Sequence, residues 1–566
     1  MNNPRIFIPI WVVVGCLLAG CQTASNKRSA ASQATASASN TVAGIQAPVP
    51  DEEEETNLTV TSPIPVLRAA SERGDALAEA ILGYLLLNGV RVPQNVEEGL
   101  QWLQRSADQG FAHAQADLGD LYLNGKFVAQ DYAKALHWLK LAADQNEPYA
   151  ERNLGACYQE GLGVETNYVT ALTLYRRAAA QTNYAAMKNL GVMYMKGLGV
   201  PQDFETAKLW LIPAAEKGNN ARAMHDLGIL ADNGAMGTNR LAEAFKWYQR
   251  SAALDEPLGR WQLAVCYRYG KSVPTNQAMY IFWMDRAAAR GNAEAQFFLG
   301  EAYRLGDGVP TNHDLAMTWY RSAATNNYPE ACYNLALDYL ADKTNQEAQV
   351  EAERWMLQAA QLGHREAQFQ YALACMQGTV VPKDVEQWRM WLERAAEGGW
   401  PKAEFMLSQA MMAGWPTYTQ DETEGEKWLE SAAAHGDFKA QCQLAARLMQ
   451  GVGITKNPAL AVKWWRWAAD HGCPEAQNDL GYAIETGNGD NADLVEACMW
   501  YQLATDQGQP NARINLARLV SRLSEEQHQD ELRRVQSFRP QPMPQLNPVQ
   551  RDGNTGTPSL NMSSDQ

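Results

Sequence analysis

Residues 463–467 read Lys-Trp-Trp-Arg-Trp, which places three indoles and two cations in five residues. Such a cluster could be a membrane-surface patch, a stacking platform for nucleic-acid bases, a shelf for sugar rings, or ordinary core packing. The formal net charge of −16 opposes contact with a nucleic-acid backbone or with anionic lipid, because both need a basic surface. The charge therefore leaves sugar contact and core packing as the interpretations to separate.

Catalysis and metal binding have little support in the spacing of the polar residues. The eight histidines are scattered, none forms His-Glu-x-x-His, and no Cys/His cluster has zinc-ligand spacing. Glycine pairs such as Gly161 and Gly163 lie outside any Gly-x-Gly-x-x-Gly motif, so we expect structural turns there. The seven cysteines beyond the N-terminal segment are odd in number, and we expect small buried side chains rather than a disulfide framework. No cofactor and no metal are expected.

The N-terminus has the features of a targeting segment. Arg5 precedes an apolar stretch at 6–18, which is too short to span a bilayer as a helix. The sequence Leu-Ala-Gly-Cys that ends at Cys21 resembles a bacterial lipobox, the signal that is cut before a lipidated cysteine. The resemblance implies a signal peptide at 1–20 and a lipid anchor on Cys21; an ordinary secretory signal is the alternative. Gln22 would favour sorting to an outer membrane, with the body facing either the periplasm or the exterior.

Both flanks of the remaining chain have a biased composition. Residues 21–62 are rich in alanine, serine and threonine and then carry an acidic run at 51–55, so we expect a disordered tether. Residues 538–566 are rich in proline, glycine and polar side chains, and we expect a disordered tail. The part between these flanks must therefore contain the fold.

This central part repeats with a spacing of 36 residues, twice stretched to 37. Each repeat has a leucine, here called the key leucine, followed by a small residue. An alanine precedes it by four residues, and a larger apolar side chain follows by four, so all three share one helix face. The key leucines are Leu82, Leu118, Leu154, Leu190, Leu227, Leu263, Leu299, Leu335, Leu407, Leu444, Leu480 and Leu516, with Tyr371 in the one gap.

A second helix is predicted in each repeat from the pattern Ala-x-x-Trp-x-x-x-Ala-Ala, for example at 135–143 and 461–469. A two-helix unit of this length cannot bury its apolar face alone, so neighbouring units must stack. We expect an N-terminal half repeat at 63–74, full repeats at 75–509, and a half repeat with a capping helix at 510–537. Ser524 and Gln527 have the spacing of a capping box at the start of that last helix.

The repeat pattern, with its Leu-Gly pair, Gly-x-Gly loop and second-helix tryptophan, resembles the Sel1-like repeats, a branch of the tetratricopeptide-like α-solenoids. Residues 184–218 and 293–326 carry it most clearly. The resemblance implies an all-α, right-handed α-solenoid of about twelve helix-turn-helix repeats plus terminal capping helices. Some secreted relatives have a cysteine pair in each repeat, which this sequence lacks.

The leading functional prediction is a non-catalytic scaffold in the cell envelope that binds a protein or peptide partner and no nucleic acid. The alternative is a module that binds peptidoglycan or another cell-wall glycan. A secreted hydrolase of the β-lactamase type is disfavoured, because no serine is followed by lysine three residues later and no Gly-x-Ser-x-Gly occurs. The sequence therefore predicts a protein that is not an enzyme.

Candidate binding residues follow from the helical phase. Two residues before the key position, five successive repeats have an aromatic side chain about 160° away from the key leucine: Trp261, Phe297, Tyr333, Phe369 and Phe405. They could form a ladder for an extended peptide or for sugar rings on the concave face that first helices line in tetratricopeptide-like arrays. They could equally pack against a neighbouring repeat.

The repeat register also divides the tryptophan cluster. Trp464 is the regular second-helix tryptophan, and Trp465 occupies a phase that usually holds leucine or tyrosine, so both are expected in the core. Trp467 replaces side chains that are mostly arginine or serine in other repeats. It is the one surplus indole and a candidate contact for a partner or for the next repeat.

Overall fold

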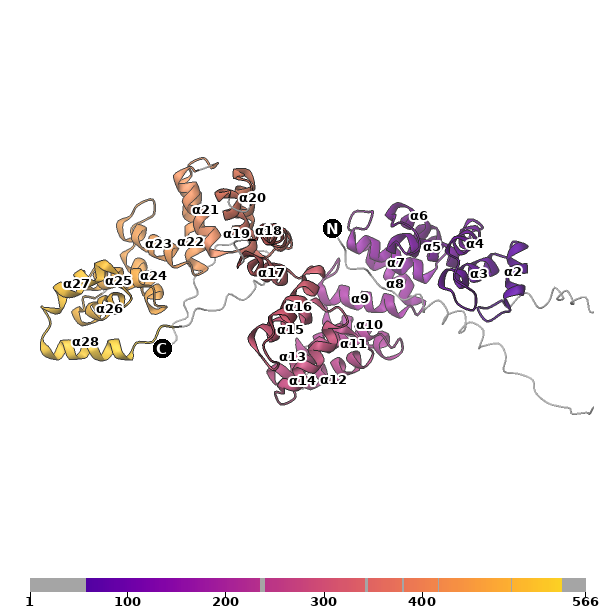
Figure 1. Ribbon diagram of the computed structural model, residues 1–566, viewed down its shortest axis with the longest axis horizontal. Coiled ribbons are helices and arrows are strands. Elements are labelled where there is room, and N and C mark those ends of the chain that lie inside the picture. Colours follow the sequence, from indigo (N-terminus) through magenta and orange to yellow (C-terminus); the bar gives the residue numbers. More distant parts are fainter. Residues whose placement is uncertain are drawn as a thin grey trace, which may run out of the picture. The chain divides into compact units, whose positions relative to one another are not determined.

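The structure is a computed structural model that describes residues 58–234, 240–341, 345–378, 381–415, 417–489 and 491–541. These residues form the helices α2 to α28 and contain no β-strand (Figure 1). Within the described ranges, no helix is long and apolar enough to cross a membrane. The chain divides into two compact units, one ending at Ala287 and one beginning at Ala288. Each unit is described by itself.

Unit 1 opens with α2 (Ile64–Glu72) and continues as pairs, each with a first helix and a second helix. Its first helices are α3 (Ala76–Asn88), α5 (Ala112–Asn124), α7 (Pro148–Glu160), α9 (Tyr184–Lys196), α11 (Ala221–Asp232) and α13 (Pro257–Tyr269). Its second helices are α4 (Val96–Asp108), α6 (Tyr132–Asp144), α8 (Tyr168–Ala180), α10 (Phe204–Glu216), α12 (Arg240–Ala253) and α14 (Gln277–Ala288).

Unit 2 has the same alternation. Its first helices are α15 (Ala293–Leu305), α17 (Pro329–Ala341), α19 (Arg365–Gln377), α21 (Pro401–Ala413), α23 (Phe438–Gln450), α25 (Pro474–Thr486) and α27 (Pro510–Val520). Its second helices are α16 (His313–Thr325), α18 (Gln346–Gln361), α20 (Val385–Glu397), α22 (Glu422–Ala434), α24 (Pro458–Asp470) and α26 (Leu494–Asp506), and the chain of helices ends with α28 (Glu525–Ser537).

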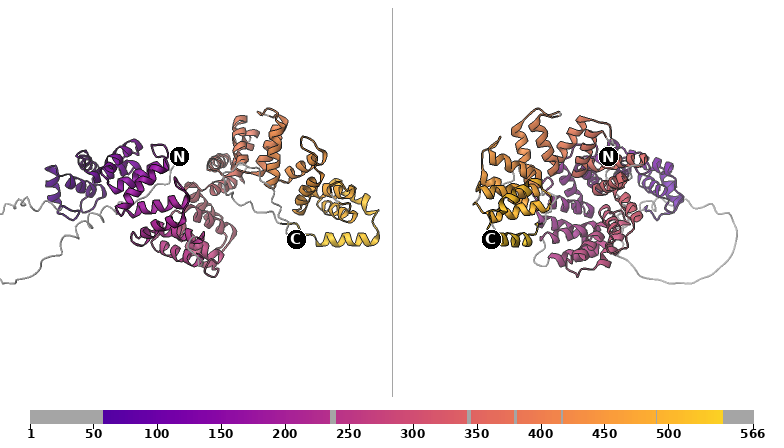
Figure 2. Two further views of the ribbon diagram at one scale, coloured as in Figure 1. Left: turned by 180° about the vertical axis from the view of Figure 1, so that it is seen from behind. Right: turned by 60° about the vertical axis from the view of Figure 1, so that its left-hand side comes forward.

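Consecutive helices stack from α2 to α13 in unit 1 and from α15 to α27 in unit 2. A first helix packs on the second helix of its own repeat, and that second helix packs on the first helix of the next repeat. Several neighbouring first helices also touch, including α9 with α11 and α23 with α25. Figure 2 shows this stacking of helix pairs from two further directions. The predicted all-α solenoid of twelve two-helix repeats is confirmed.

The helix boundaries follow from turn chemistry. Most second helices begin after an asparagine or aspartate whose side chain accepts a hydrogen bond from a backbone N–H of the first turn, as Asn167 does from Thr170 (3.0 Å). Most first helices end at a glycine with positive φ, such as Gly161 at +70°. The first glycine of each pair therefore terminates a helix, and the second lies in the turn that follows, as expected of structural turns.

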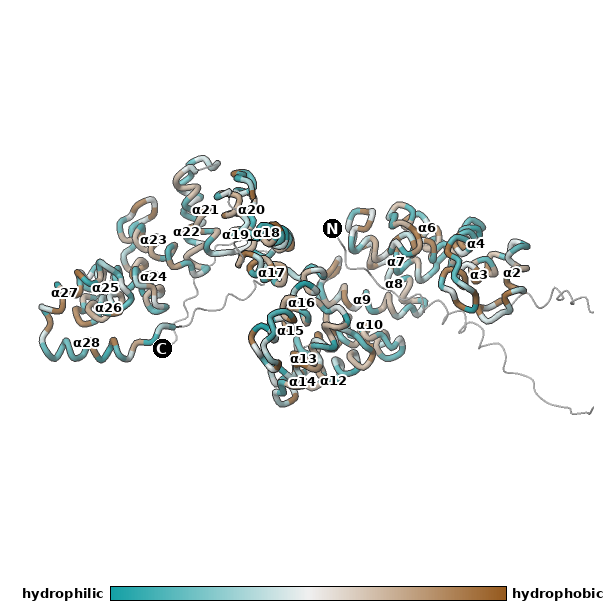
Figure 3. The backbone as a smooth tube through the Cα atoms, in the orientation of Figure 1, coloured by the Kyte–Doolittle hydropathy of each residue, from teal (hydrophilic) through white to brown (hydrophobic). Residues whose placement is uncertain are grey.

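The predicted repeat positions form the core of each repeat. Every alanine four residues before a key position is fully buried, and so are nearly all key leucines. On the second helices, the Ala-Ala pair is buried and the tryptophan is buried or half-buried. Figure 3 shows hydrophobic and hydrophilic residues alternating along the helices, as expected when one side of each helix faces a neighbour.

A close contact joins the two helices of most repeats directly after the key leucine. At Gly155, Gly228, Gly300 and Gly481, an added Cβ would lie within 2.9 Å of a tyrosine ring on the second helix. Three repeats that have alanine at this place carry a more flexible or smaller side chain at the facing position: Ala264 with Met284, Ala336 with Met356 and Ala372 with Leu392, whereas Trp465 occupies the place that faces Ala445. In the described repeats, a tyrosine at the facing position therefore occurs together with a glycine.

The packed part of unit 1 begins earlier in the chain than the sequence predicted. Leu58 is buried and Val60 is half-buried against α2 and α3, although both lie in the segment assigned to the tether. Arg91 also donates a hydrogen bond to the carbonyl oxygen of Ser62 (3.0 Å). The end of the predicted tether therefore covers the exposed side of the first helix pair.

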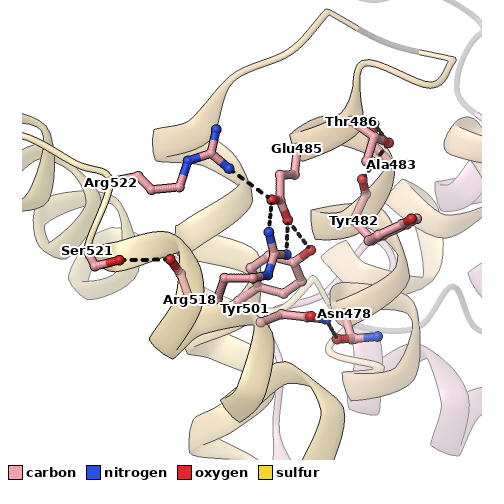
Figure 4. A network of polar contacts seen from close by, with 10 residues as sticks. Asn478, Tyr482, Ala483, Glu485, Thr486, Tyr501, Arg518, Ser521 and Arg522 are labelled. Carbon is pink, nitrogen blue, oxygen red and sulfur yellow. Dashed lines mark hydrogen bonds and ion pairs between the residues drawn. The ribbon is translucent and has the colours of Figure 1, made fainter.

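The C-terminal edge of unit 2 is closed by α27 and α28. Glu485 at the end of α25 accepts hydrogen bonds from Arg518 (2.5 and 2.6 Å) and Tyr501 (3.0 Å), and Arg522 lies at 3.4 Å (Figure 4). The Arg518 guanidinium and the other partners hold the pKa of Glu485 below its usual value. This network ties the half repeat to the last full repeat.

The capping helix α28 begins with the predicted capping box between Ser524 and Gln527. Beyond it, Phe538 packs on Trp500 with ring centroids 5.4 Å apart, and Gln541 donates a backbone hydrogen bond to Asp470 (2.9 Å). The first residues assigned to the tail therefore belong to the packed structure, because Phe538 is a large apolar side chain that covers the end of the core.

Candidate binding surfaces

The five aromatic residues two positions before the key residue do not form a continuous exposed ladder. Trp261, Tyr333 and Phe369 are buried, and Phe297 and Phe405 are half-buried. Tyr333 stacks on His364 of the next repeat at 4.4 Å, and Phe297 lies 5.1 Å from Tyr328. These rings fill the space between neighbouring repeats, which is the packing interpretation. A binding role for the exposed edges of Phe297 and Phe405 stays a prediction.

Most of the tryptophan cluster at 463–467 is also part of the packed core. Trp464 and Trp465 are buried, as the repeat register predicted. Trp467 is half-buried and stacks on His471 with ring centroids 3.9 Å apart, and Phe438 of α23 lies 6.3 Å away. His471 also contacts the backbone oxygen of Trp467 through Nδ1 (2.7 Å). The surplus indole is thus held within the repeat and against its neighbour, and only part of it could meet a partner.

Two adjacent hollows between first and second helices of unit 2 form what we call the apolar groove. One hollow, of about 300 Å³, is lined by Leu373, Met376, Trp388, Met406, Gln409, Ala410, Ala413 and Trp415. The other, of about 210 Å³, is lined by Leu337, Leu340, Ala352, Glu353, Met356, Gln370, Tyr371, Leu373, Ala374, Gln377 and Val381. Leu373 of α19 lines both hollows. The groove therefore runs across α17, α19 and α21.

The groove exposes large apolar side chains to solvent, and this exposure does not stabilise the isolated protein. Trp415 is 54% exposed and Leu337 is 44% exposed. The large apolar residues of the lining are leucine, methionine, tryptophan, tyrosine and valine, with alanine and glutamine between them, and they suit the burial of apolar groups of varied shape. Glu353 is the one carboxylate among its lining residues. The arrangement can bind apolar side chains and offers little for acid–base chemistry.

The sequence prediction missed this groove because it followed the position two residues before the key leucine. The groove is lined instead from one residue before it, as at Met406, and from two residues after it, as at Leu337 and Leu373. In unit 1 the place one residue before the key leucine is polar in most repeats, as at Asp117, but the place two residues after it is mostly apolar, as at Val192 and Ile229. These two places therefore do not distinguish the groove in the sequence, because the hollows depend on how neighbouring helices pack.

Unit 1 has a charged surface on its first helices. Asp117 and Asp120 lie on α5, and Glu147 caps the start of α7 by accepting a hydrogen bond from Ala150 N (2.6 Å). Burial, together with the negative charges of Asp120 and Glu147, raises the pKa of Asp117 to about 8. Burial also raises the pKa of Glu147 to about 7. Both carboxyl groups are therefore partly protonated near neutral pH.

We predict that Asp117→Asn stabilises the protein at pH 8 and has little effect at pH 4. The folded-state pKa of Asp117 lies above the unfolded value, so the unfolded chain releases the proton first, and stability falls as pH rises through the folded pKa. Asparagine removes this penalty, which we expect to be about 1–2 kcal/mol at pH 8 after allowance for solvent screening. Thermal unfolding of the full chain at both pH values measures it, with exposed Asp144→Asn as the matched control. Equal stabilities of wild type and Asp117→Asn at pH 8 would contradict the prediction.

The described residues contain no group of three or more His, Cys, Asp or Glu side chains arranged to hold a metal ion. All seven described cysteines are free thiols, and six of them are buried. Cys21, the predicted lipidation site, lies outside the described residues.

Comparison with known proteins gives a family for the repeats. The family model described as Sel1 repeat matches twelve segments: 76–111, 112–147, 148–183, 185–219, 221–256, 257–292, 293–328, 329–364, 365–400, 401–437, 438–473 and 474–509. No curated protein matches the chain.

Several solved structures resemble the chain. A protective antigen present in uropathogenic Escherichia coli strains, displaying an SLR fold, is 29% identical; the match covers 84% of this chain and 94% of that chain, with a TM-score of 0.46. A Sel1 repeat protein from Oxalobacter formigenes is 27% identical over 58% of this chain and 93% of that chain, with a TM-score of 0.42. A putative sel1 repeat protein from Klebsiella pneumoniae is 22% identical over 35% of this chain and 96% of that chain, with a TM-score of 0.27.

Proposed function

Because the chain belongs to the Sel1 repeat family, whose members generally mediate protein–protein interactions, we propose that it is a non-catalytic scaffold anchored by lipid in a bacterial cell envelope. Its partner is a protein that inserts an extended apolar segment into the apolar groove. The observation that carries this proposal is the pair of hollows that share Leu373. Each hollow is large enough for one or two apolar side chains.

The spacing of the hollows suggests the form of the segment. Packed helices lie about 8–10 Å apart. An extended segment in the polyproline II conformation rises about 3.1 Å per residue with three residues per turn, so two apolar side chains three residues apart point the same way and would enter neighbouring hollows. Methionine and leucine on the walls adapt to different side chains, so we expect a preference for apolar character rather than for a single residue type.

The membrane part of the proposal rests on the lipobox-like sequence that ends at Cys21. We predict that Cys21→Ser prevents lipidation and moves the protein from the membrane fraction to the soluble fraction. Metabolic labelling with a fatty-acid analogue and fractionation of cells measure both effects. A wild-type protein that takes up no label, or a variant that stays in the membrane fraction, would contradict the anchor.

The partner class is tested by two parallel assays with the purified chain. Capture of detergent-solubilised envelope proteins tests the scaffold, and co-sedimentation with protein-free cell wall tests glycan binding. We expect a reproducible protein partner that is displaced by an apolar peptide, and no saturable sedimentation. Saturable sedimentation without a protein partner would replace the proposed function with glycan binding.

A further inference from the structure

Two cysteines of unit 2 occupy a pair of positions whose side chains touch in other repeats. The first position lies two residues before the key residue, and the second directly precedes the first helix of the next repeat, 31 residues further on. Phe297 and Tyr328 fill these positions with ring centroids 5.1 Å apart, and the rings of Tyr333 and His364 stack at 4.4 Å. The repeat geometry therefore brings the two side chains together across the boundary between two repeats.

At the boundary between the repeats 438–473 and 474–509, the same two positions hold Cys442 and Cys473. Cys442 lies on α23, Cys473 directly precedes α25, and both pack in one hydrophobic cluster. Their thiols hydrogen-bond to each other. Because the repeat geometry already holds the two side chains in contact, small side-chain rotations suffice to bring the sulfur atoms to bonding distance.

Solvent and small reagents can reach this pair. Cys442 is half-buried, whereas Cys473 is 7% exposed and donates a hydrogen bond from its thiol to Glu475 Oε2 (3.4 Å). Glu475 is exposed, so its carboxylate offers the thiol proton a path to water. The other five described cysteines are buried and lie in five different repeats. Cys442 and Cys473 therefore combine mutual contact with access from solvent.

We propose that Cys442 and Cys473 form a disulfide bond that ties the repeat at 438–473 to the repeat at 474–509. The oxidant is an external disulfide, that of a thiol–disulfide oxidoreductase or of oxidised glutathione. The Cys442 thiolate attacks one external sulfur, the external S–S bond breaks, and one external thiolate leaves. Cys473 then attacks the Cys442 sulfur, so that the internal bond forms and the second external thiolate leaves. The two protons and two electrons of the protein thiols end on the two released external thiols.

The bond strengthens the C-terminal end of the stack. It closes a loop that contains α24 and joins α23 directly to the start of α25, in the repeat on which α27 and α28 pack. Closing a loop of this length restricts the unfolded chain and so favours the folded state. The proposed envelope location would supply the oxidising conditions in which such a bond persists. The chemistry of the pair depends neither on that location nor on the apolar groove.

The test oxidises the purified full chain with excess oxidised glutathione at pH 8, blocks the remaining thiols and digests the chain without reduction. Mass spectrometry is expected to find Cys442 joined to Cys473, with fragmentation used to separate Cys473 from Cys498 on the same tryptic peptide. The oxidised chain should unfold at a midpoint at least about 4 °C above that of the reduced chain. Cys442→Ser and Cys473→Ser should each abolish this difference. Cys375→Ala, which changes a buried thiol of α19, is the matched control and should keep it.

Three results would overturn the proposal. A stable mixed disulfide between glutathione and Cys442 would show that Cys473 does not reach the Cys442 sulfur. Dimers on a non-reducing gel that replace the internal bond, and that are lost in Cys442→Ser, would assign Cys442 to a contact between two chains. Equal midpoints for the oxidised and reduced wild type would show that the pair does not tie the two repeats together.

Discussion

Gly228→Ala is expected to lower the stability of unit 1 by about 2–3 kcal/mol, the largest change in stability predicted for a single added methyl group. The new Cβ would lie 2.3 Å from Cε1 and 2.5 Å from Cδ1 of Tyr248. That ring is fully buried between α11 and α12, so it cannot move aside without displacing other core side chains. Chemical denaturation of the full chain measures the effect as an earlier transition of part of the structure.

The repeats supply the control for this substitution. In three of the repeats where alanine follows the key residue, the second helix has Met284, Met356 or Leu392 at the facing place. The double variant Gly228→Ala with Tyr248→Met should therefore recover much of the loss, giving a coupling of at least about 1 kcal/mol in a double-mutant cycle. Additive effects of the two substitutions would show that the contact does not determine the stability of this repeat.

Leu373→Asp is expected to raise the dissociation constant of apolar peptides by at least about thirtyfold, which corresponds to a loss of about 2 kcal/mol in binding free energy. Leu373 lines both hollows, so one carboxylate there meets any segment that occupies the groove and must be desolvated when the segment binds. Peptides selected from a random library on the wild-type chain provide the ligand, and fluorescence anisotropy gives the dissociation constants.

The matched control introduces the same charge elsewhere in unit 2. Val350 on α18 is 60% exposed and does not line the groove, so Val350→Asp should leave the dissociation constants within about twofold. Thermal unfolding of both variants checks that the fold is kept. If the Leu373→Asp protein bound the selected peptides as tightly as wild type, the groove would not be their binding surface.

The fold could be predicted from the sequence because each repeat has the same physical requirement. Leu227 and Ala223 must face the second helix at helical spacing, and the same pair recurs in every unit with one or two replacements. The termini were harder to predict. Leu58 and Phe538 lie in segments whose average composition is polar, so a prediction from composition missed the single apolar side chains that cover the ends of the stack.

The candidate sites were less predictable for a reason of geometry. A residue about 160° from the key leucine is expected to be exposed on an isolated helix pair. In a stack, the neighbouring repeat covers that side, so Tyr333 and Phe369 become core residues. The same burial leaves the Nε atom of Arg152 without a hydrogen-bond partner. Contacts between repeats decide whether a side chain at this position is buried or exposed. The spacing of residues within one repeat does not reveal those contacts.

The proposed function requires the apolar groove to be the surface that binds a partner protein. Photo-crosslinking amino acids placed at Trp415 and at Leu337, on the two hollows, test it in living cells, with Val350 and Leu305 as exposed controls outside the groove. We expect both groove positions to capture the same protein through a segment with two apolar side chains about three residues apart. Capture of the same products from all four positions, or no capture from the groove, would contradict it.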